Sequence, residues 1–387
     1  MRPSRQRPLT VLLDATEKCN LKCTMCYFSA TDRLRWEPFD RELSPDGMMP
    51  LEVFEKIAAD LFPRAWRVAL ACAAEPLIHP RFIEMVGIAG RYRVPDLWFP
   101  TNLLALTEKK AQAIVDAEVT TVGVSIDGTR QETYEAIRIG GKWARLMKVL
   151  DLFNQTREER RAKTGLRIIF TWMKTNRGDL LQLPEFAERH GANEIDVRFV
   201  VPTAGVDVSD EVLDGEDPSR LRDELGTAAE DAVRRGLRLS SYPEYDSAEE
   251  MSGPLARLRR QWFRRRAGLD RWEYTHYRMR ERLKGCVWPG DFYVVRPNGA
   301  VSPCIFWNQE PIGYYPDDSF AELSQGPRLT AILDGLRSGR PVGTCQSCSQ
   351  RKNALYVRLK RLVGRGDSGD LAEARGSGSG SSDLVQL

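Results

Sequence analysis

A chain of 387 residues is long enough to bury a large core, and this length predicts two or three structural units. The net charge is only +3 and no long block carries a single sign, so the charge argues neither for nor against nucleic acid. No apolar run approaches the roughly 20 residues that span a bilayer, and Asp14 interrupts an N-terminal stretch that is already too short for a signal peptide. We therefore expect a cytoplasmic protein with neither a nucleic-acid nor a membrane partner.

Short apolar runs alternate with longer amphipathic ones from residue 9 to about residue 205. The short runs predict strands and the amphipathic runs predict helices. This alternation, repeated about six times, predicts a parallel sheet with helices outside it, whereas periodicity does not tell whether the sheet closes. The expected strands are 9–15, 67–73, 96–102, 120–127, 166–173 and 194–201, and the expected helices are 51–61, 81–93, 107–118, 143–160 and 179–190.

The pattern changes toward the C-terminus. A further helix (218–236) and a short strand (237–243) precede residues 250–284, which are helical in pattern and rich in arginine and aromatic residues. That segment is either a solvated helical insertion or a cap over a site for an anionic or sugar-like substrate. Residues 292–304 are typical of a hairpin with Pro-Asn-Gly in its turn. The Gly/Ser-rich end predicts a disordered tail.

Three cysteines, Cys19, Cys23 and Cys26, lie within eight positions in the segment TEKCNLKCTMCYF, with the spacing C-x3-C-x2-C. Eight cysteines in a cytosolic chain indicate metal binding or catalysis before disulfides. These three follow the first strand, at the end where parallel α/β folds place their sites. Such thiolates can converge on a four-iron cluster with one iron left open, or on a zinc ion with a fourth ligand from elsewhere.

This cysteine pattern, the aromatic residue after it and the repeated β/α units resemble the radical S-adenosylmethionine enzymes over most of residues 9–205. The stretch 73–82 is similar to the family's second-strand GGEP motif, with alanines in place of the glycines. Thr101-Asn102 and residues 125–128 (SIDG) resemble the ends of its third and fourth strands. The resemblance implies a partial (β/α)6 TIM-type barrel that binds a [4Fe–4S] cluster and S-adenosyl-L-methionine.

The resemblance also implies roles for particular residues. Alanine at 73–74 matters if the backbone there needs torsions that only glycine adopts easily. The implied cluster ligands are Cys19, Cys23 and Cys26. The implied cofactor contacts are Tyr27 at the adenine, the backbone of Ala73, Ala74, Glu75 and Pro76 at the methionine amine, Asn102 at the third strand end, and Ser125 and Asp127 at the ribose or methionine carboxylate.

A second set of cysteines lies near the C-terminus: Cys286 and Cys304 in the pattern C-x12-G-x4-C, then Cys345 and Cys348 as C-x2-C. Taken alone, the set suits a zinc ribbon as well as an iron–sulfur cluster. Behind the core it resembles the family's auxiliary domain in its shorter "twitch" form, since the full SPASM form places another cysteine near residue 354. That implies a second [4Fe–4S] cluster in which every iron is ligated, which suits electron transfer. The expected divisions are a core at 1–245, an insertion at 246–284, an auxiliary domain with a β-hairpin at 285–355 and a tail at 356–387.

Two further residues are candidates for catalysis. Cys72, the eighth cysteine, is either a small buried residue or a thiol that donates a hydrogen atom to a substrate radical. Arg198 points, by strand alternation, into the site, where it either touches substrate or cofactor or forms a structural ion pair.

Three reactions follow from the resemblance. The first is oxidation of an alcohol in a small molecule to a ketone, as in the sugar and aminocyclitol dehydrogenases of antibiotic biosynthesis, with an external reductant of flavodoxin or ferredoxin type. The second is epimerisation with Cys72 as hydrogen donor. The third, peptide maturation, is less favoured because only eighteen residues precede Cys19, which leaves no room for a leader-binding domain. A non-catalytic iron–sulfur or zinc scaffold would not need a cofactor-sized set of strand-end residues.

Overall fold

The computed structural model describes most of the two regions in which function is expected. The expected insertion (246–284), the expected tail (356–387) and Tyr27 lie outside the described residues, so the predictions about them stay predictions. The described residues are 9–26, 46–200, 206–213, 216–242, 286 and 288–348.

The core is a curved sheet of parallel strands, as the alternation predicts. Each strand pairs in parallel with the next one along the chain, and all six expected strands are confirmed. The weak pattern at 237–243 is a seventh strand, which pairs with the sixth. The strands are β1 (Leu9–Leu13), β2 (Ala65–Ala69), β3 (Asp96–Thr101), β4 (Thr121–Ser125), β5 (Gly165–Trp172), β6 (Glu194–Phe199) and β7 (Arg238–Tyr242).

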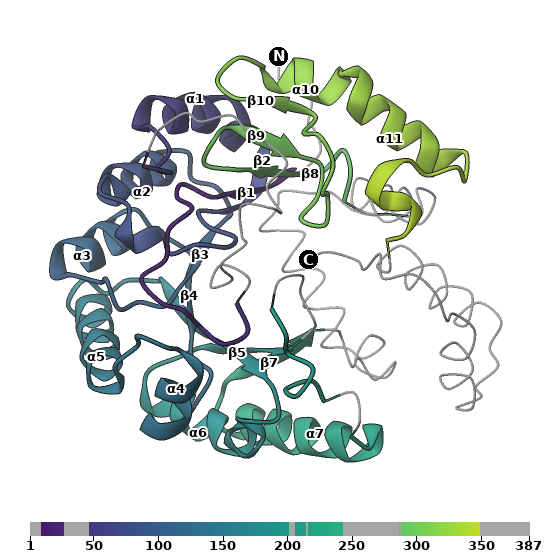
Figure 1. Cartoon of the computed structure of the whole chain (residues 1–387). Helices are drawn as coiled ribbons and strands as arrows, with labels where there is room; N and C mark the ends of the chain where they lie inside the picture. The colour runs from purple at the N-terminus through teal and green to yellow at the C-terminus, as the bar shows by residue number, and fades with distance from the viewer. Residues whose placement is uncertain are drawn as a thin grey trace.

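Helices form an arc around the outside of this sheet (Figure 1). Each amphipathic helix buries one apolar face against the sheet. In α1 the buried residues are Val53, Phe54, Ile57, Ala58 and Leu61, whose spacing puts them on one side of the helix. The expected helix 179–190 is a 3-10 turn followed by a short α-helix that starts just before Pro184, since proline is tolerated in a first turn but not in a helix interior. The helices are α1 (Leu51–Leu61), α2 (Phe82–Arg91), α3 (Glu108–Asp116), α4 (Gln131–Ile137), α5 (Trp143–Glu159), α6 (Leu183–Arg189) and α7 (Pro218–Arg234).

The two faces of the strands differ in polarity. In β3, Leu97 and Phe99 are buried under the helices, whereas Asp96 and Trp98 are half-buried on the inner face. The same alternation in β6 buries Ile195 and puts charged residues inside. In the part of the chain that the structure describes, the edge strands β7 and the last strand, β10, do not pair with each other, so the barrel is open. Its inner face, the lumen, is therefore polar and partly exposed.

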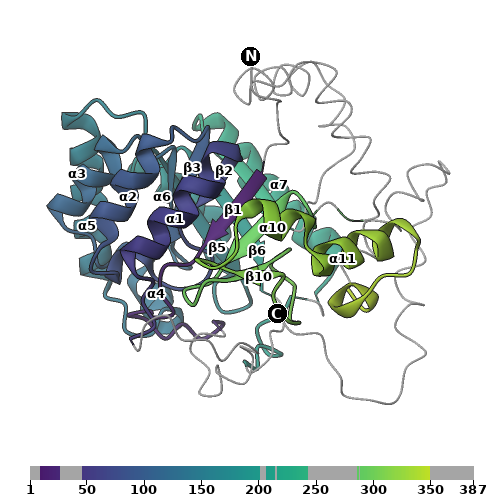
Figure 2. The same cartoon turned by 90° about the horizontal axis from the view of Figure 1, so that it is seen from above.

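The C-terminal hairpin continues the barrel sheet, which the sequence does not reveal. The strand β8 (Phe292–Val295) pairs in parallel with β1, from Thr10 opposite Phe292 to Leu13 opposite Val295. The turn of the hairpin contains Gly299 with φ 80°, a conformation that suits glycine. Two further strands and two helices follow in this region: β9 (Ala300–Ser302), β10 (Gly313–Tyr314), α10 (Phe320–Gln325) and α11 (Pro327–Arg337). Figure 2 shows these two helices on the side of the molecule away from α2 and α3. Among the described residues, no helix is both long and apolar enough to cross a membrane.

Candidate functional site

The loop that carries Cys19, Cys23 and Cys26 follows β1 and is held by the segment after α4. The backbone N–H of Lys22 donates to the carbonyl of Ile139 at 2.9 Å, and that of Thr24 donates to the carbonyl of Ile137 at 3.0 Å. Sequence reasoning does not predict α4, which has only seven residues and so shows less than two turns of periodicity. A helix missed in the sequence thus supports the first cysteine loop.

Glu75 joins the ends of β2 and β3 beneath this loop. Its side chain is buried and accepts hydrogen bonds from Thr101 Oγ1 at 2.6 Å, from the N–H of Asn102 at 2.6 Å and from the N–H of Leu77 at 3.0 Å. Its own N–H donates to the carbonyl of Lys18 at 3.0 Å. Burial raises the pKa of this carboxyl group, although the hydrogen bonds work in the opposite direction. The sequence-based prediction concerned the Glu75 backbone, whereas its side chain organises the site.

Asn102 reaches from the end of β3 to the cysteine loop. Its Nδ2 donates to Asn20 Oδ1 at 2.8 Å and lies 3.9 Å from Cys19 Sγ. The next residue, Leu103, has φ 65°, a strained conformation for a side chain of this kind, and it is buried. The backbone bends sharply here and places the Asn102 amide beside Cys19.

Asp127 acts on the same loop through Arg138. Its buried carboxylate accepts from the N–H of Thr171 at 2.7 Å and pairs with Arg138 Nη2 at 2.6 Å. Arg138, which follows α4, is also buried, and its Nη1 lies 3.8 Å from Cys23 Sγ. Burial raises the pKa of the Cys23 thiol, and the charge of Arg138 opposes that shift. The predicted contact of Asp127 with the cofactor stays a prediction, as does that of Ser125, which is half-buried at the end of β4.

The alanines in place of the family's glycines do not require unusual torsions. The non-glycine residues with positive φ in the described parts of the chain are Arg93, Leu103, Glu118 and Arg161, so Ala73 and Ala74 adopt conformations open to any residue. Pro76 begins a short 3-10 turn and is buried. The backbone of 73–76 is therefore free of the conflict that the substitutions suggest.

The donors of this loop fit an iron–sulfur cluster. Two thiols are contacted by nitrogen donors, Cys19 by Asn102 and Cys23 by Arg138, and such donors stabilise thiolate ligands. The Nε atom of Arg138 is buried and has no hydrogen-bond partner within the described residues, so this side chain can serve an anion beside it. In the same part of the chain, no three His, Cys, Asp or Glu side chains gather closely enough to hold a single metal ion.

Cys304, of the second set of cysteines, is buried just after β9. Burial raises the pKa of the Cys304 thiol to about 12, and negative charge on Cys345, Cys286 or Cys348 raises it further. The three other thiols therefore lie within electrostatic range of Cys304. A hydrogen bond of 3.2 Å from the N–H of Asn308 to Thr344 Oγ1 ties the Cys304 segment to the Cys345 segment.

Cys72 lies three residues beyond β2 and is half-buried. Its N–H donates to Asp14 Oδ1 at 2.6 Å. Burial raises the pKa of its thiol to about 12 and the charge of Asp14 adds to this, whereas Arg296 and Arg198 oppose it. Cys72 is therefore a protonated thiol at neutral pH, with two arginines in electrostatic range.

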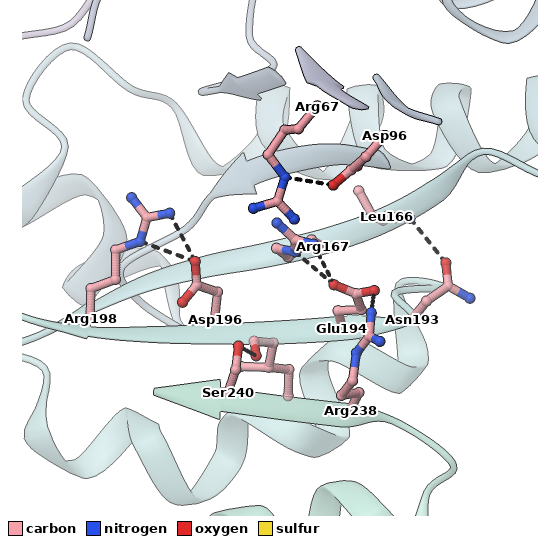
Figure 3. Close-up of polar contacts among 11 residues, drawn as sticks. Arg67, Asp96, Leu166, Arg167, Asn193, Glu194, Asp196, Arg198, Arg238 and Ser240 are labelled. Carbon is pink, nitrogen blue, oxygen red and sulfur yellow. Dashed lines mark hydrogen bonds and ion pairs between the residues drawn. The ribbon is translucent and has the colours of Figure 1, made fainter. Parts of the chain in front are cut away.

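Ion pairs on β2, β3, β5, β6 and β7 line the lumen (Figure 3). In β6, Glu194 pairs with both Arg167 of β5 and Arg238 of β7. Four residues further along the same strand, Arg198 donates two hydrogen bonds to one oxygen of Asp196, at 3.1 and 2.8 Å. Of the two roles considered for Arg198, the structural ion pair is thus present. Its side chain nevertheless remains 43% exposed inside the barrel and can reach a ligand.

Trp98 adds an aromatic surface to the lumen. The guanidinium of Arg167 lies 5.4 Å from the centre of its ring, in a cation–π contact. Its indole Nε1 is buried and has no hydrogen-bond partner among the residues described. The lumen therefore offers an aromatic surface in addition to its charges.

Sequence reasoning missed Arg138 and Asp14 as site residues. One signal was available for Asp14, since a carboxylate at the carboxyl end of a buried parallel strand faces the usual site of such folds. For Arg138, the two glycines that follow it mark a tight turn, in which a Cβ on Gly141 would lie 2.8 Å from the carbonyl oxygen of Arg138. Nothing in the sequence tells which arginine is buried.

Comparisons with known proteins agree with this geometry. Residues 14–169 match the radical SAM superfamily, and residues 286–349 match an iron–sulfur cluster-binding domain of the SPASM type. An AdoMet-dependent heme synthase of Methanosarcina barkeri is 24% identical over 371 residues, which cover 93% of this chain and 94% of that protein. A GTP 3′,8-cyclase of Listeria monocytogenes is 27% identical over 191 residues, which cover 49% of this chain and 53% of the cyclase. The chain thus spans about half the length of the cyclases that it matches.

Solved structures share the fold. Streptococcus suis SuiB bound to S-adenosylmethionine superposes with a TM-score of 0.62 at 16% identity, over 90% of this chain and 72% of that chain. The anSMEcpe structure with bound AdoMet has a TM-score of 0.56 at 16% identity, over 88% of this chain and 87% of that one. The first matched domain implies a [4Fe–4S] cluster and S-adenosylmethionine, and the second implies a further iron–sulfur cluster, so the expected cofactors are confirmed. The chain thus combines a radical SAM domain with a C-terminal iron–sulfur cluster-binding domain of the SPASM type.

Proposed function

We propose that this radical SAM enzyme oxidises a carbinol carbon of a polar small molecule, of sugar or aminocyclitol type, to a ketone. The observation that carries the proposal is the presence of four cysteines, Cys286, Cys304, Cys345 and Cys348, in the region that matches an iron–sulfur cluster-binding domain, because four thiolate ligands would leave no iron of a four-iron cluster open and so favour electron transfer over substrate binding. When bound, the first cluster and S-adenosylmethionine supply a 5′-deoxyadenosyl radical, and the chain supplies placement. With both groups bound, the substrate would lose a hydrogen atom to that radical, a proton to a base and one electron to the auxiliary cluster.

The lumen supports the choice of a polar substrate. Its inner face carries paired arginines and carboxylates, and burying an apolar molecule against them would cost the hydration of these charges. Hydroxyl and amino groups can instead accept from arginine and donate to carboxylate. The half-buried ring of Trp98 adds an aromatic surface beside these charges, which suits the carbon face of a sugar-like ring.

Transfer of label from the substrate tests this proposal. Inositols, aminocyclitols and alditols that carry deuterium at their carbinol carbons are incubated with the reconstituted enzyme, S-adenosylmethionine and a one-electron reductant. We expect one of them to transfer deuterium to 5′-deoxyadenosine and to yield an equal amount of ketone, measured by mass spectrometry. Transfer of deuterium without ketone, or no transfer from any of these polyols, would contradict the proposal.

Epimerisation is a second candidate, which the environment of Cys72 favours. Its thiol stays protonated, because burial raises its pKa to about 12, and it lies at the strand-end face beside Asp14. A protonated thiol can return a hydrogen atom to a substrate radical. Epimerisation predicts one deuterium from D2O at one carbon of the product, which is lost in Cys72→Ala. If the product carries no solvent deuterium, epimerisation is excluded, and ketone formation by Cys72→Ala would then assign the reaction to oxidation.

The remaining expectations are proposals of the same kind. SuiB has also been solved bound to the precursor peptide SuiA. This likeness has 16% identity and carries the fold alone, so it does not support peptide maturation by this chain. We propose cytoplasmic location, an external reductant of flavodoxin or ferredoxin type, and the divisions 1–245, 246–284, 285–355 and 356–387. The ligand roles of the seven cysteines and the cofactor contacts predicted from the sequence are part of this proposal.

A further inference from the structure

Asp14, the residue immediately after β1, connects three parts of the molecule. Its side chain is buried, at 3% relative exposure. Its Oδ1 accepts two backbone hydrogen bonds, from Cys72 N at 2.6 Å and from Ala73 N at 3.0 Å. Its Oδ2 pairs with Arg296 Nη1 at 3.1 Å. A single carboxylate thus contacts the loop after β2 and the hairpin after β8.

Each of these contacts leads toward a site described above. Ala73 is the first residue of the segment 73–76, the proposed cofactor-binding backbone, and Cys72 directly precedes it. Arg296 begins the hairpin turn, and eight residues further along the chain lies Cys304, of the auxiliary set. The N–H of Asp14 also donates to the carbonyl of Val295 at 2.9 Å, so the pairing of β1 with β8 fixes the position of its side chain.

The Asp14–Arg296 ion pair is buried, so each charge depends on the other for stabilisation. Arg296 has only 16% side-chain exposure, and Asp14 has 3%. A carboxylate so far from water needs its cation and its N–H donors, because an unpaired buried charge is strongly unfavourable. Moving the hairpin would withdraw Arg296, and the carboxylate would then depend on the two amides of the loop alone.

We propose that Asp14 is a positioning residue that fixes the loop at 72–76 for S-adenosylmethionine, and that Arg296 makes this position depend on the auxiliary hairpin. The proposal rests on the assignment of 73–76 to the cofactor, and it does not depend on which substrate is oxidised. Loss of order in the auxiliary hairpin therefore weakens cofactor binding in the core. The two domains are coupled before any electron passes between them.

Three variants separate the two contacts. Asp14→Ala removes both of them. Asp14→Asn keeps an oxygen for the two amides of the loop but loses the charge that holds Arg296. Arg296→Met leaves the carboxylate in place without its cation. Asp60→Asn is a matched control, because Asp60 of α1 also joins the core to the C-terminal region, through Tyr315 Oη at 2.9 Å and the N–H of Phe320, but does not contact the loop.

The first measurement is hydrogen exchange of the unloaded chain, by mass spectrometry of peptides that cover 70–76. We expect Asp14→Ala to raise the exchange rate there about tenfold or more, since two hydrogen bonds are lost. We expect Asp14→Asn and Arg296→Met to raise it by smaller and similar factors, and Asp60→Asn to leave it unchanged. The second measurement is the dissociation constant of S-adenosylmethionine on the reconstituted protein, which should increase in the same order.

The outcomes decide both halves of the proposal. Wild-type exchange and affinity in Asp14→Asn would overturn it, and this variant retains the shape of the side chain if Asp14→Ala does not fold. Changes in Asp14→Asn without changes in Arg296→Met would overturn the dependence on the hairpin. An effect of Asp60→Asn equal to that of Arg296→Met would show general loosening of the C-terminal region and would also overturn it. None of these readouts depends on product, so a failed oxidation proposal leaves them valid.

Discussion

Cys304→Ala is expected to cleave S-adenosylmethionine at saturating cofactor concentration and to release no ketone. Cys304 is buried and feels the charges of the three other auxiliary cysteines, so its loss removes one of the four donors of the set. Two [4Fe–4S] clusters hold about eight irons, and we expect the iron content to fall to about four in this variant. The substrate radical then has no acceptor for its second electron. Iron content, 5′-deoxyadenosine and ketone, measured on the same preparation, check this result.

A control variant separates the role of the thiol from damage to the hairpin. Ser302 lies in β9, two residues before Cys304, and is also buried, so Ser302→Ala perturbs the same hairpin and retains all four cysteines. It should keep about eight irons and form ketone. Normal ketone from Cys304→Ala with four irons would contradict the electron-acceptor role. Loss of S-adenosylmethionine cleavage at saturation in Cys304→Ala alone would mean that the auxiliary cluster serves the first step as well.

The repeated β/α core could be predicted from sequence because its signal is local. Each strand and helix shows its own period, and the strand ends carry Glu75, Asn102 and Asp127 at the face where parallel folds place their sites. The pairing of β8 with β1 could not be predicted in this way. It joins Thr10 to Phe292, and apolar strands of similar composition offer many equivalent partners.

Roles that arise from burial were also beyond the sequence. The cofactor contact of Asp127 stays a prediction, whereas the pairing of its carboxylate with Arg138 and with the N–H of Thr171 was not foreseen. Arg138 belongs to a chain with 57 basic residues, most of which have no distinguishing pattern. Its importance comes from a tertiary arrangement in which a seven-residue helix carries it under Cys23. Short helices and buried ions are set by packing, which local periodicity does not report.

Arg138→Met is expected to lower the free energy of unfolding of the unloaded protein by about 3–5 kcal/mol, because it leaves a buried carboxylate without its cation. Asp127 is completely buried and Arg138 has 9% side-chain exposure, so water cannot replace the missing partner. The double variant Asp127→Asn/Arg138→Met should recover part of the loss, since no charge is then stranded. Urea titration followed by circular dichroism measures all three values.

Arg198→Met is the matched control for this prediction. Arg198 forms the same kind of pair with Asp196, but its side chain is 43% exposed, and we expect a loss of about 0–1 kcal/mol. Equal losses in the two single variants would contradict the view that burial makes the Asp127–Arg138 pair important. If burial is the cause, Arg138→Met should also bind iron less well after reconstitution, because the cysteine loop rests on the carbonyls of Ile137 and Ile139 on either side of this residue. A destabilised Arg138→Met that still takes up a full complement of iron would instead restrict the pair to folding and separate it from the cluster site.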